Sequence, residues 1–241
     1  MSYLTFHLLL ILPPIGVMYL TLPRPLYDMG GYRATLSIPL VALIAFSYTT
    51  PWDNYLVARQ VWWYGPDRVL ATIGHVPVEE YLFFLLQPVF TGLFFFQYLG
   101  RVGLNHGTTG AGNAWAGFGL FTGLTGLGGG LLLRGAPSGV YMGLVLSWAA
   151  PVIAGMWLYD GETLWRYRRA LLYTVGGPTL YLWVADGIAI SSEIWIISSE
   201  MTLGLSIFAL PVEEATFFLV TNLLVVKGIL LLLHGNHDAL E

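Results

Sequence analysis

Two pairs of adjacent glutamates interrupt otherwise apolar stretches of the chain. Glu79-Glu80 and Glu213-Glu214 each begin two residues after a proline. A carboxyl group among apolar side chains is costly unless it is paired or used, and such groups are uncommon there. Two carboxyl groups whose surroundings differ can divide the roles of general acid and general base. The glutamates therefore predict proton-transfer chemistry at an apolar site.

The glutamate pairs belong to an internal repeat. Residues 77–85 read Pro-Val-Glu-Glu-Tyr-Leu-Phe-Phe-Leu, and residues 211–219 read Pro-Val-Glu-Glu-Ala-Thr-Phe-Phe-Leu, an offset of 134 positions. Upstream, Asp53 and Trp62 match Asp186 and Trp195 at an offset of 133. Self-similarity over this length indicates that the chain is a duplication.

The composition is that of an integral membrane protein. Of the 241 residues, 56% are apolar and 10% are charged, and the mean hydropathy is +0.69, whereas a soluble chain carries about 25% charged residues. The net charge of −4 argues against a nucleic-acid partner. The lack of cysteine excludes disulfides, thiol catalysis, iron–sulfur clusters and Cys-ligated zinc. No nucleotide fingerprint is present, and His7, His75, His106, His234 and His237 are scattered, so we expect no cofactor and no metal.

We expect an all-α integral membrane protein with seven or eight transmembrane helices. Apolar segments of about the length that crosses a bilayer lie near residues 3–22, 34–52, 70–99, 112–133, 139–159, 169–190 and 201–233. Residues 1–100 are expected to form the first repeat of three helices, 101–137 a glycine-rich spacer helix, and 138–241 the second repeat. Because three spans and the spacer make four, both halves enter from the same side, as parallel repeats do.

The basic residues predict the orientation. With seven spans, one side of the membrane holds Arg24, Arg33, Arg101, Arg166, Arg168, Arg169 and Lys227, and the other holds Arg59, Arg68 and Arg134. Since basic residues favour the cytoplasmic side, the pattern predicts a multi-pass cell-membrane protein. Its N-terminus is expected outside and its C-terminus in the cytoplasm, and no cleavable signal is evident.

Distance along the chain places both glutamate pairs near mid-membrane. Glu80 lies twelve residues past Arg68 and Glu214 fourteen past Glu200, at about 1.5 Å per helical residue. A plainer interpretation is a helix start, because proline and carboxylates both favour the first turn. The second glutamate of each pair continues onto a less apolar helix face. Glu80 and Glu214 are therefore expected to face a shared interior, with Glu79 and Glu213 beside them.

Other polar residues in the apolar segments receive structural interpretations. Asp53 and Asp186, at the outer ends of the second and sixth spans, are expected to cap a helix or bind a partner rather than to catalyse. His75 is expected to be a core or gating histidine. Lys227 is expected to extend its ammonium group toward lipid headgroups.

The combined motifs resemble those of the membrane-embedded, heterodimer-type lycopene cyclases. The motifs are Pro51-Trp52-Asp53-Asn54-Tyr55, Gly74-His75-Val76-Pro77-Val78-Glu79-Glu80 and Leu210-Pro211-Val212-Glu213-Glu214. The resemblance covers essentially the whole chain and suggests the form in which two half-proteins are fused. The second half has Trp183-Val184-Ala185-Asp186 in place of the first motif, so the halves are not equivalent.

The resemblance implies a redox-neutral cyclisation of the linear ends of lycopene to β-ionone rings through a carbocation. It implies that Glu79, Glu80, Glu213 and Glu214 are the acid–base residues, supported by Asp53, Asp186, Asn54 and His75. Aromatic residues near the motifs could bind a polyene and stabilise a cation through their π faces: Trp52, Tyr55, Phe83, Phe84, Phe218 and Trp183. The expected partners are lycopene taken from the bilayer, membrane lipid and other carotenoid enzymes.

Three other activities remain open at this point. A retinal protein could use Lys227 as a Schiff base, although no acidic residue lies one turn before it. A proton-coupled transporter could also use paired intramembrane carboxylates. A carotenoid hydratase could trap the same carbocation with water. Which glutamate is the acid is not evident from the sequence.

Overall fold

The structure, a computed structural model, describes residues 1–104 and 111–234, with side chains beyond the gap from Asn113 onward. The long helices are α3 (Gly31–Ala58), α4 (Val78–Val102), α5 (Ala111–Leu133), α6 (Val140–Arg166), α7 (Arg168–Ser191) and α8 (Val212–His234). The first span is α1 (Tyr3–Phe6), the π-helical turn η1 (His7–Ile11) and α2 (Leu12–Leu20); the 3₁₀ turns are η2 (Leu26–Met29) and η3 (Pro137–Gly139). The strands are β1 (Trp62–Tyr64), β2 (Thr72–Ile73), β3 (Val76–Pro77), β4 (Trp195–Ile197), β5 (Ser206–Ile207) and β6 (Leu210–Pro211).

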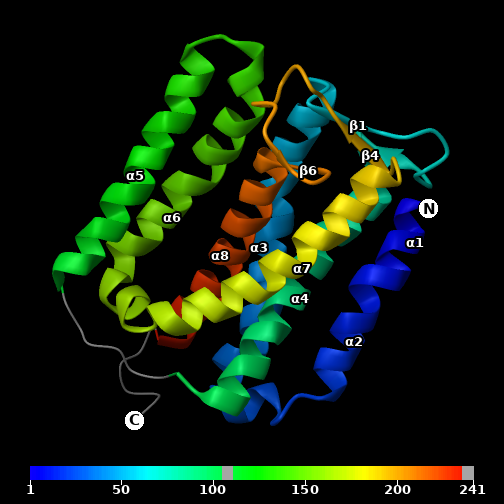
Figure 1. The fold of residues 1–241 in the computed structure, drawn as a ribbon. Helices are drawn as coiled ribbons and strands as arrows, with labels where there is room; N and C mark the ends of the chain where they lie inside the picture. The colour runs from blue at the N-terminus through cyan, green and yellow to red at the C-terminus, as the bar shows by residue number, and fades with distance from the viewer. Residues whose placement is uncertain (105–110, 235–241) are drawn as a thin grey trace.

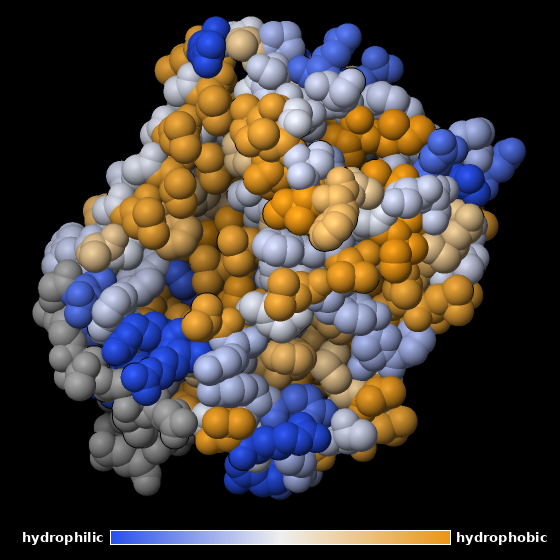
Figure 2. Space-filling view, viewed as in Figure 1, coloured by the Kyte–Doolittle hydropathy of each residue, from blue (hydrophilic) through white to orange (hydrophobic). Residues whose placement is uncertain are grey.

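The prediction of an all-α, multi-pass membrane protein is confirmed in this coarse form. Within the described residues, six helical segments are long and apolar enough to span a bilayer: Tyr3–Leu20, Gly31–Ala58, Val78–Val102, Asn113–Leu133, Pro137–Arg166 and Val212–His234. The remaining long helix, α7, has 24 residues and is not among these six. Apolar side chains cover much of the face in Figure 2, and hydrophilic residues gather toward its upper and lower ends.

Short strands replace helix at the start of two predicted spans. The spans expected at 70–99 and 201–233 begin as helix only at Val78 and Val212, because the preceding residues form the hairpins β2–β3 and β5–β6. A third, antiparallel pair joins β1 to β4 with Tyr64 opposite Trp195. The order helix, three strands, helix therefore occurs twice, as α3-β1-β2-β3-α4 and as α7-β4-β5-β6-α8. The labelled strands lie at the end of the bundle that carries the N-terminus (Figure 1).

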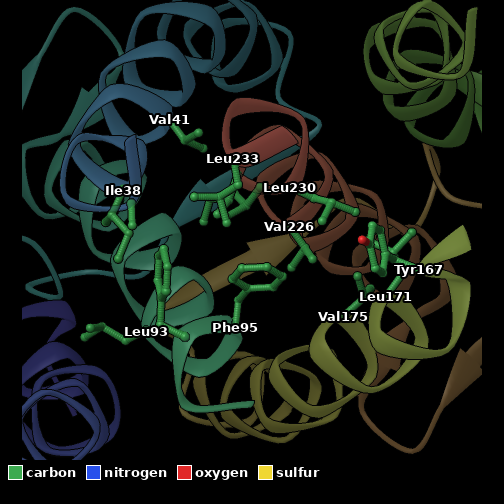
Figure 3. Close-up of a cluster of buried hydrophobic side chains, with 14 of the residues drawn as sticks. Ile38, Val41, Leu93, Phe95, Tyr167, Leu171, Val175, Val226, Leu230 and Leu233 are labelled. Atoms are coloured by element: carbon green, nitrogen blue, oxygen red, sulfur yellow. The ribbon is translucent and has the colours of Figure 1, made fainter. Parts of the chain in front are cut away.

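An apolar core joins helices from both halves of the chain. Its buried side chains point toward one another from α3, α4, α7 and α8 and from the α6–α7 junction (Figure 3); those labelled are Ile38, Val41, Leu93, Phe95, Tyr167, Leu171, Val175, Val226, Leu230 and Leu233. Apolar surface gives little net drive for association when the surroundings are lipid, so close packing and hydrogen bonds must supply specificity.

A buried hydrogen-bond network supplies part of that specificity. Asn222 of α8 accepts hydrogen bonds from the Gln87 amide and the Thr91 hydroxyl of α4, both at 2.6 Å. Its own amide donates to the Thr179 hydroxyl of α7 at 3.0 Å. Since Gln87 and Asn222 lie 135 positions apart, this network ties the C-terminal helices to α4.

The glycine-rich spacer helix α5 packs closely against α6. A Cβ atom on Gly128 would lie 2.8 Å from the backbone nitrogen of Ser147, whereas Gly129 has open space around it.

Lys227 of α8 lies against the same pair of helices, α5 and α6, and is 1% exposed. Its ammonium lies 4.4 Å from the Trp157 ring centroid and 4.9 Å from that of Phe121. The expectation that Lys227 reaches lipid headgroups is therefore wrong, because the aromatic faces hold its cation inside the bundle.

Asn54 anchors the β2–β3 hairpin. Its side-chain oxygen accepts the His75 backbone N–H at 3.0 Å, and its amide donates to the Tyr81 hydroxyl at 3.0 Å. Gly74, at φ +67°, leaves room for this contact, since a Cβ there would lie 2.6 Å from the Asn54 oxygen. In the second hairpin the equivalent position is Phe208, fully exposed and also at positive φ. Only the first half has the asparagine anchor, because Gly187 stands at the matching site.

We expect Gly128→Ala to weaken the α5–α6 contact. Its methyl group would press on the α6 backbone, and such overpacking costs about 1–3 kcal/mol. Thermal unfolding in detergent should show the loss. Gly129→Ala is the matched control, since open space surrounds that position. Equal stability of the two variants would contradict the packing described.

We expect Asn54→Ala to loosen the β2–β3 hairpin. Loss of hydrogen bonds worth about 1 kcal/mol each should speed tryptic cleavage at Arg68 by about fivefold or more. Gly187→Ala, at the matching position of the second half, should leave cleavage unchanged because it has open space. Unaltered cleavage in Asn54→Ala would mean that the hairpin is held by other contacts.

Candidate functional site

Four carboxyl groups from four helices line one small cavity. Asp53 lies on α3, Glu80 on α4, Asp186 on α7 and Glu214 on α8, and the cavity they share measures about 40 Å³. That volume exceeds the roughly 10–15 Å³ that a cavity needs to hold one water molecule. The cavity is a place where carboxyl groups from both halves of the chain meet.

The glutamates occupy the first turns of their helices. Pro77 is the N-cap of α4, so Glu79 and Glu80 follow Val78 in the first turn, and Glu213 and Glu214 occupy the same place in α8. Proline and carboxylates both suit a helix N-terminus, where backbone N–H groups lack helical partners. The interpretation as a helix start is therefore confirmed, and the pairs lie in the first turn of α4 and α8 rather than twelve or more helical residues beyond Arg68 and Glu200. Residues ahead of each pair form a hairpin, which advances less regularly than a helix.

The side chains of the two glutamates in each pair point in different directions. Glu79 accepts a hydrogen bond from the Leu70 backbone N–H at 2.8 Å, and Glu213 accepts one from the Leu203 N–H at 2.7 Å. Each first glutamate thus holds the loop that precedes its own hairpin. The second glutamates, Glu80 and Glu214, turn into the shared cavity, so the prediction that these two face a common interior is confirmed.

Tyrosine hydroxyls bind the cavity glutamates, and sequence reasoning missed them. Tyr3 donates to Glu80 at 2.7 Å and Tyr141 donates to Glu214 at 2.6 Å. Both tyrosines are 1% exposed, and each lies in the first turn of a helix, α1 for Tyr3 and α6 for Tyr141. Their recurrence at the starts of the first and fifth spans was the available signal. Tyr64 of β1 also donates to Glu80, at 3.3 Å.

The Tyr64 hydroxyl stays protonated and so remains a hydrogen-bond donor. Burial raises the pKa of its phenol well above the ordinary value, and the negative charge of Glu80 raises it further. A phenol in these surroundings keeps its proton and can only donate to a carboxylate.

The two aspartates are buried beside the cavity, whereas they were expected at the outer ends of their helices. Asp53 and Asp186 are 2% and 1% exposed and lie within α3 and α7 rather than at their ends. The Trp195 indole donates to Asp186 at 2.9 Å. The second oxygen of each aspartate has no hydrogen-bond partner among the described residues. Neither aspartate caps a helix, and both line the cavity with the glutamates.

A long apolar groove adjoins the carboxyl cavity. Its volume is about 380 Å³, and its walls come from α3, α4, α6 and α8. Phe83 and Phe217 line both spaces. Its lining on α8 extends from Phe217 to Leu232, fifteen residues and so about 22 Å along the helix.

The predicted aromatic residues separate into two groups. Phe83 and Phe218 line the carboxyl cavity and Phe84 lines the groove, while Trp52 stacks on Trp148 and Phe217 with centroids 4.6 and 5.7 Å apart. Trp52, Tyr55 and Trp183 line neither space. Tyr55 is 48% exposed beside Arg59, and the Trp183 indole donates to the Ala215 carbonyl. A position near a motif in sequence did not place these three at the cavity.

The histidines have other surroundings than predicted. His75 is exposed at the β2–β3 turn and is not a core residue. His7 is fully buried in the first span, where its ring nitrogen lies 2.9 Å from the Glu79 carbonyl oxygen. His106 and His237 lie outside the described residues. Asn54 acts on the hairpin and is not among the residues that line the cavity.

Comparisons with known proteins agree on one family. The family model described as lycopene cyclase matches residues 1–99 and 139–231. The chain is 38% identical to a lycopene beta-cyclase of Halobacterium salinarum over 231 residues, which cover 95% of both chains. No solved structure matches the chain.

Fungal relatives are longer. The chain is 32% identical to a bifunctional lycopene cyclase/phytoene synthase of Arthroderma gypseum, and the match covers 95% of this chain but 41% of that protein. For the protein of the same name from Blakeslea trispora, the identity is 33%, with 94% of this chain and 38% of that protein covered. With the match to the family model and full-length similarity to the Halobacterium enzyme, the chain belongs to the lycopene cyclase family.

Proposed function

We propose that the chain is a lycopene β-cyclase, an intramolecular lyase that converts the linear ends of lycopene to β-ionone rings. The products are then γ-carotene and β-carotene. The observation that carries the proposal is the meeting of Glu80 and Glu214 in a cavity that shares Phe83 and Phe217 with a long apolar groove. Family membership and the name of the Halobacterium relative support the same activity.

The proposed chemistry needs an acid, a base and no electron carrier. A carboxyl group protonates the terminal double bond of the polyene, and the C5=C6 double bond attacks the tertiary cation that results. A carboxylate then removes the C6 proton, so that the product is an isomer of the substrate. Glu80 and Glu214 are the acid–base pair in this scheme, because they come from different halves and face one cavity.

The groove is the proposed polyene site. Its walls are apolar apart from a few hydroxyl and amide side chains, which suits a hydrocarbon that enters from the bilayer. Rings of Phe83, Phe217 and Phe218 meet the carboxyl cavity, where their π faces can stabilise a transient cation. A linear substrate lying in the groove would thus present one end to the glutamates.

Asp53 and Asp186 are proposed to support the glutamates. Both have an oxygen without a hydrogen-bond partner among the described residues, and both line the cavity. They can therefore accept or relay a proton beside Glu80 and Glu214. Glu79 and Glu213 are proposed to act indirectly, since each is bound to a backbone N–H of the preceding loop.

The proposed membrane arrangement has seven spans in two parallel repeats. It adds α7 to the six apolar segments, since α7 packs against α4 and α8. The repeats are residues 1–100 and 138–241, with 101–137 as the spacer. The strand-bearing end is proposed to lie outside the cell and the end rich in arginine in the cytoplasm. The names of the fungal bifunctional relatives support association with other carotenoid enzymes.

We expect ring-bearing carotenoids when the chain is expressed in a host that accumulates lycopene. Glu80→Gln and Glu214→Gln should each lower β-ring formation by about 100-fold or more, because acid–base groups contribute at that scale. Chromatography of the pigments measures the outcome. The exposed residues Glu193 and Glu200 provide matched Glu→Gln controls that should retain activity.

The same pigment analysis separates the other activities. A hydroxylated acyclic product would identify a hydratase, and retinal-dependent absorbance that requires Lys227 would identify a retinal protein. Unchanged lycopene with coupled proton movement would identify a transporter. Full β-ring formation by both glutamine variants would exclude the proposed acid–base pair.

We expect single cysteines to report the orientation, because the chain contains no native cysteine. Ser199→Cys, in the exposed turn after β4, should react with a membrane-impermeant maleimide on intact cells. Asp28→Cys, in the exposed turn η2 at the opposite end, should react only after the cells are opened. The reversed pattern would invert the proposed topology, and the cysteine-free parent gives the background.

A further inference from the structure

The two cavity glutamates receive unequal numbers of hydroxyl donors. Oε2 of Glu80 accepts hydrogen bonds from the Tyr3 hydroxyl at 2.7 Å and the Tyr64 hydroxyl at 3.3 Å. Among the described residues Glu214 accepts one, from the Tyr141 hydroxyl to Oε1 at 2.6 Å. Because a donor stabilises the ionised carboxylate over the neutral acid, the surroundings of Glu80 favour its ionised form more.

The difference in hydroxyl donors arises at the β1–β4 strand pair, which joins the two halves. Trp62 and Trp195 occupy matching positions of the repeat, so Ile197 stands where Tyr64 stands in the first half. Both residues line the carboxyl cavity. An isoleucine cannot donate a hydrogen bond, so the second half lacks the second phenol.

We propose that Glu80 is the base and Glu214 the acid of the cyclisation, with Tyr3, Tyr64 and Tyr141 as positioning residues that set these roles. This inference rests on the proposed lycopene cyclase function and deepens it. The phenols donate hydrogen bonds to the glutamates, so they act by orienting the carboxyl groups and by stabilising one charge state.

The proton balance of the step closes. The Glu214 carboxyl gives its proton to C2 of the terminal C1=C2 bond, which leaves a cation at C1. The C5=C6 electrons form the C1–C6 bond and move the cation to C5. Glu80 takes the C6 proton, and the C6–H electrons restore the C5=C6 double bond. One proton then returns from Glu80 to Glu214 through the cavity that they share.

Several titratable groups surround Glu80 and Glu214 and influence the pH dependence of the proposed reaction. Asp53 on α3 and Asp186 on α7 line the cavity, and Glu79 and Glu213 are the neighbours of the two glutamates in sequence. The phenols come from α1, β1 and α6: Tyr3, Tyr64 and Tyr141. Variants that change one phenol and leave these carboxyl groups in place isolate its effect.

The experiment measures β-ring formation against pH with purified, reconstituted protein. Tyr64→Phe removes one donor from the base, so the acidic limb of the profile should move up by about one pH unit. Tyr141→Phe removes the donor from the acid, so Glu214 keeps its proton longer and the alkaline limb should move up instead. Tyr181→Phe is the matched control, since that hydroxyl binds the Leu10 carbonyl and lines no part of the cavity.

The product pattern gives a second readout. Without its base, Glu80→Gln should yield rings whose double bond is displaced, because the C5 cation loses a proton from C4 or from its methyl group. Glu214→Gln should return only lycopene. Exchanged patterns, or a Tyr64→Phe profile whose acidic limb does not move, would overturn the assignment. A parent protein that forms no ring at all would instead refute the proposed function.

Discussion

Placing carboxyl groups inside an apolar helical bundle is the constraint on which the rest of this structure depends. Apolar surroundings solvate them poorly, so other protein groups must supply most of their partners. Backbone N–H groups of Leu70 and Leu203 bind the first glutamates, and phenols bind the second. These partners come from loops, a strand and other helices. The site therefore exists only when the whole bundle is assembled.

The hairpins before α4 and α8 meet this constraint. A continuous helix through Pro77 or Pro211 would leave the glutamates in its interior, where proline also removes a backbone donor. The strands instead make each proline an entry point, and the glutamates follow in the first turn, where unpaired N–H groups and the helix dipole favour carboxylates. One arrangement thus places acidic groups at the end of an apolar groove on both helices.

Both halves of the chain contribute to the shared cavity, and they differ at positions around it. The β1–β4 pair joins the halves beside the cavity, so that one carboxyl group from each of four helices can meet there. The halves differ at particular matching positions, with Tyr64 against Ile197 and Asn54 against Gly187. Two similar halves around one cavity allow one glutamate to differ from its counterpart, and acid–base catalysis needs such a difference.

The sequence by itself determined the membrane class, the repeat and the orientation of the second glutamates, Glu80 and Glu214, toward a shared interior. Composition, self-similarity and helical periodicity are local properties, readable along the chain. It did not reveal the contacts of Tyr3 and Tyr141 or the burial of Asp53, Asp186 and Lys227. His75, expected as a core or gating residue, is exposed at a turn and does not belong to the core. Only the tertiary structure decided these, because they depend on which side chains from distant segments meet. A hydrogen bond between Tyr3 and Glu80 joins residues 77 positions apart, and no periodicity within one helix encodes that contact.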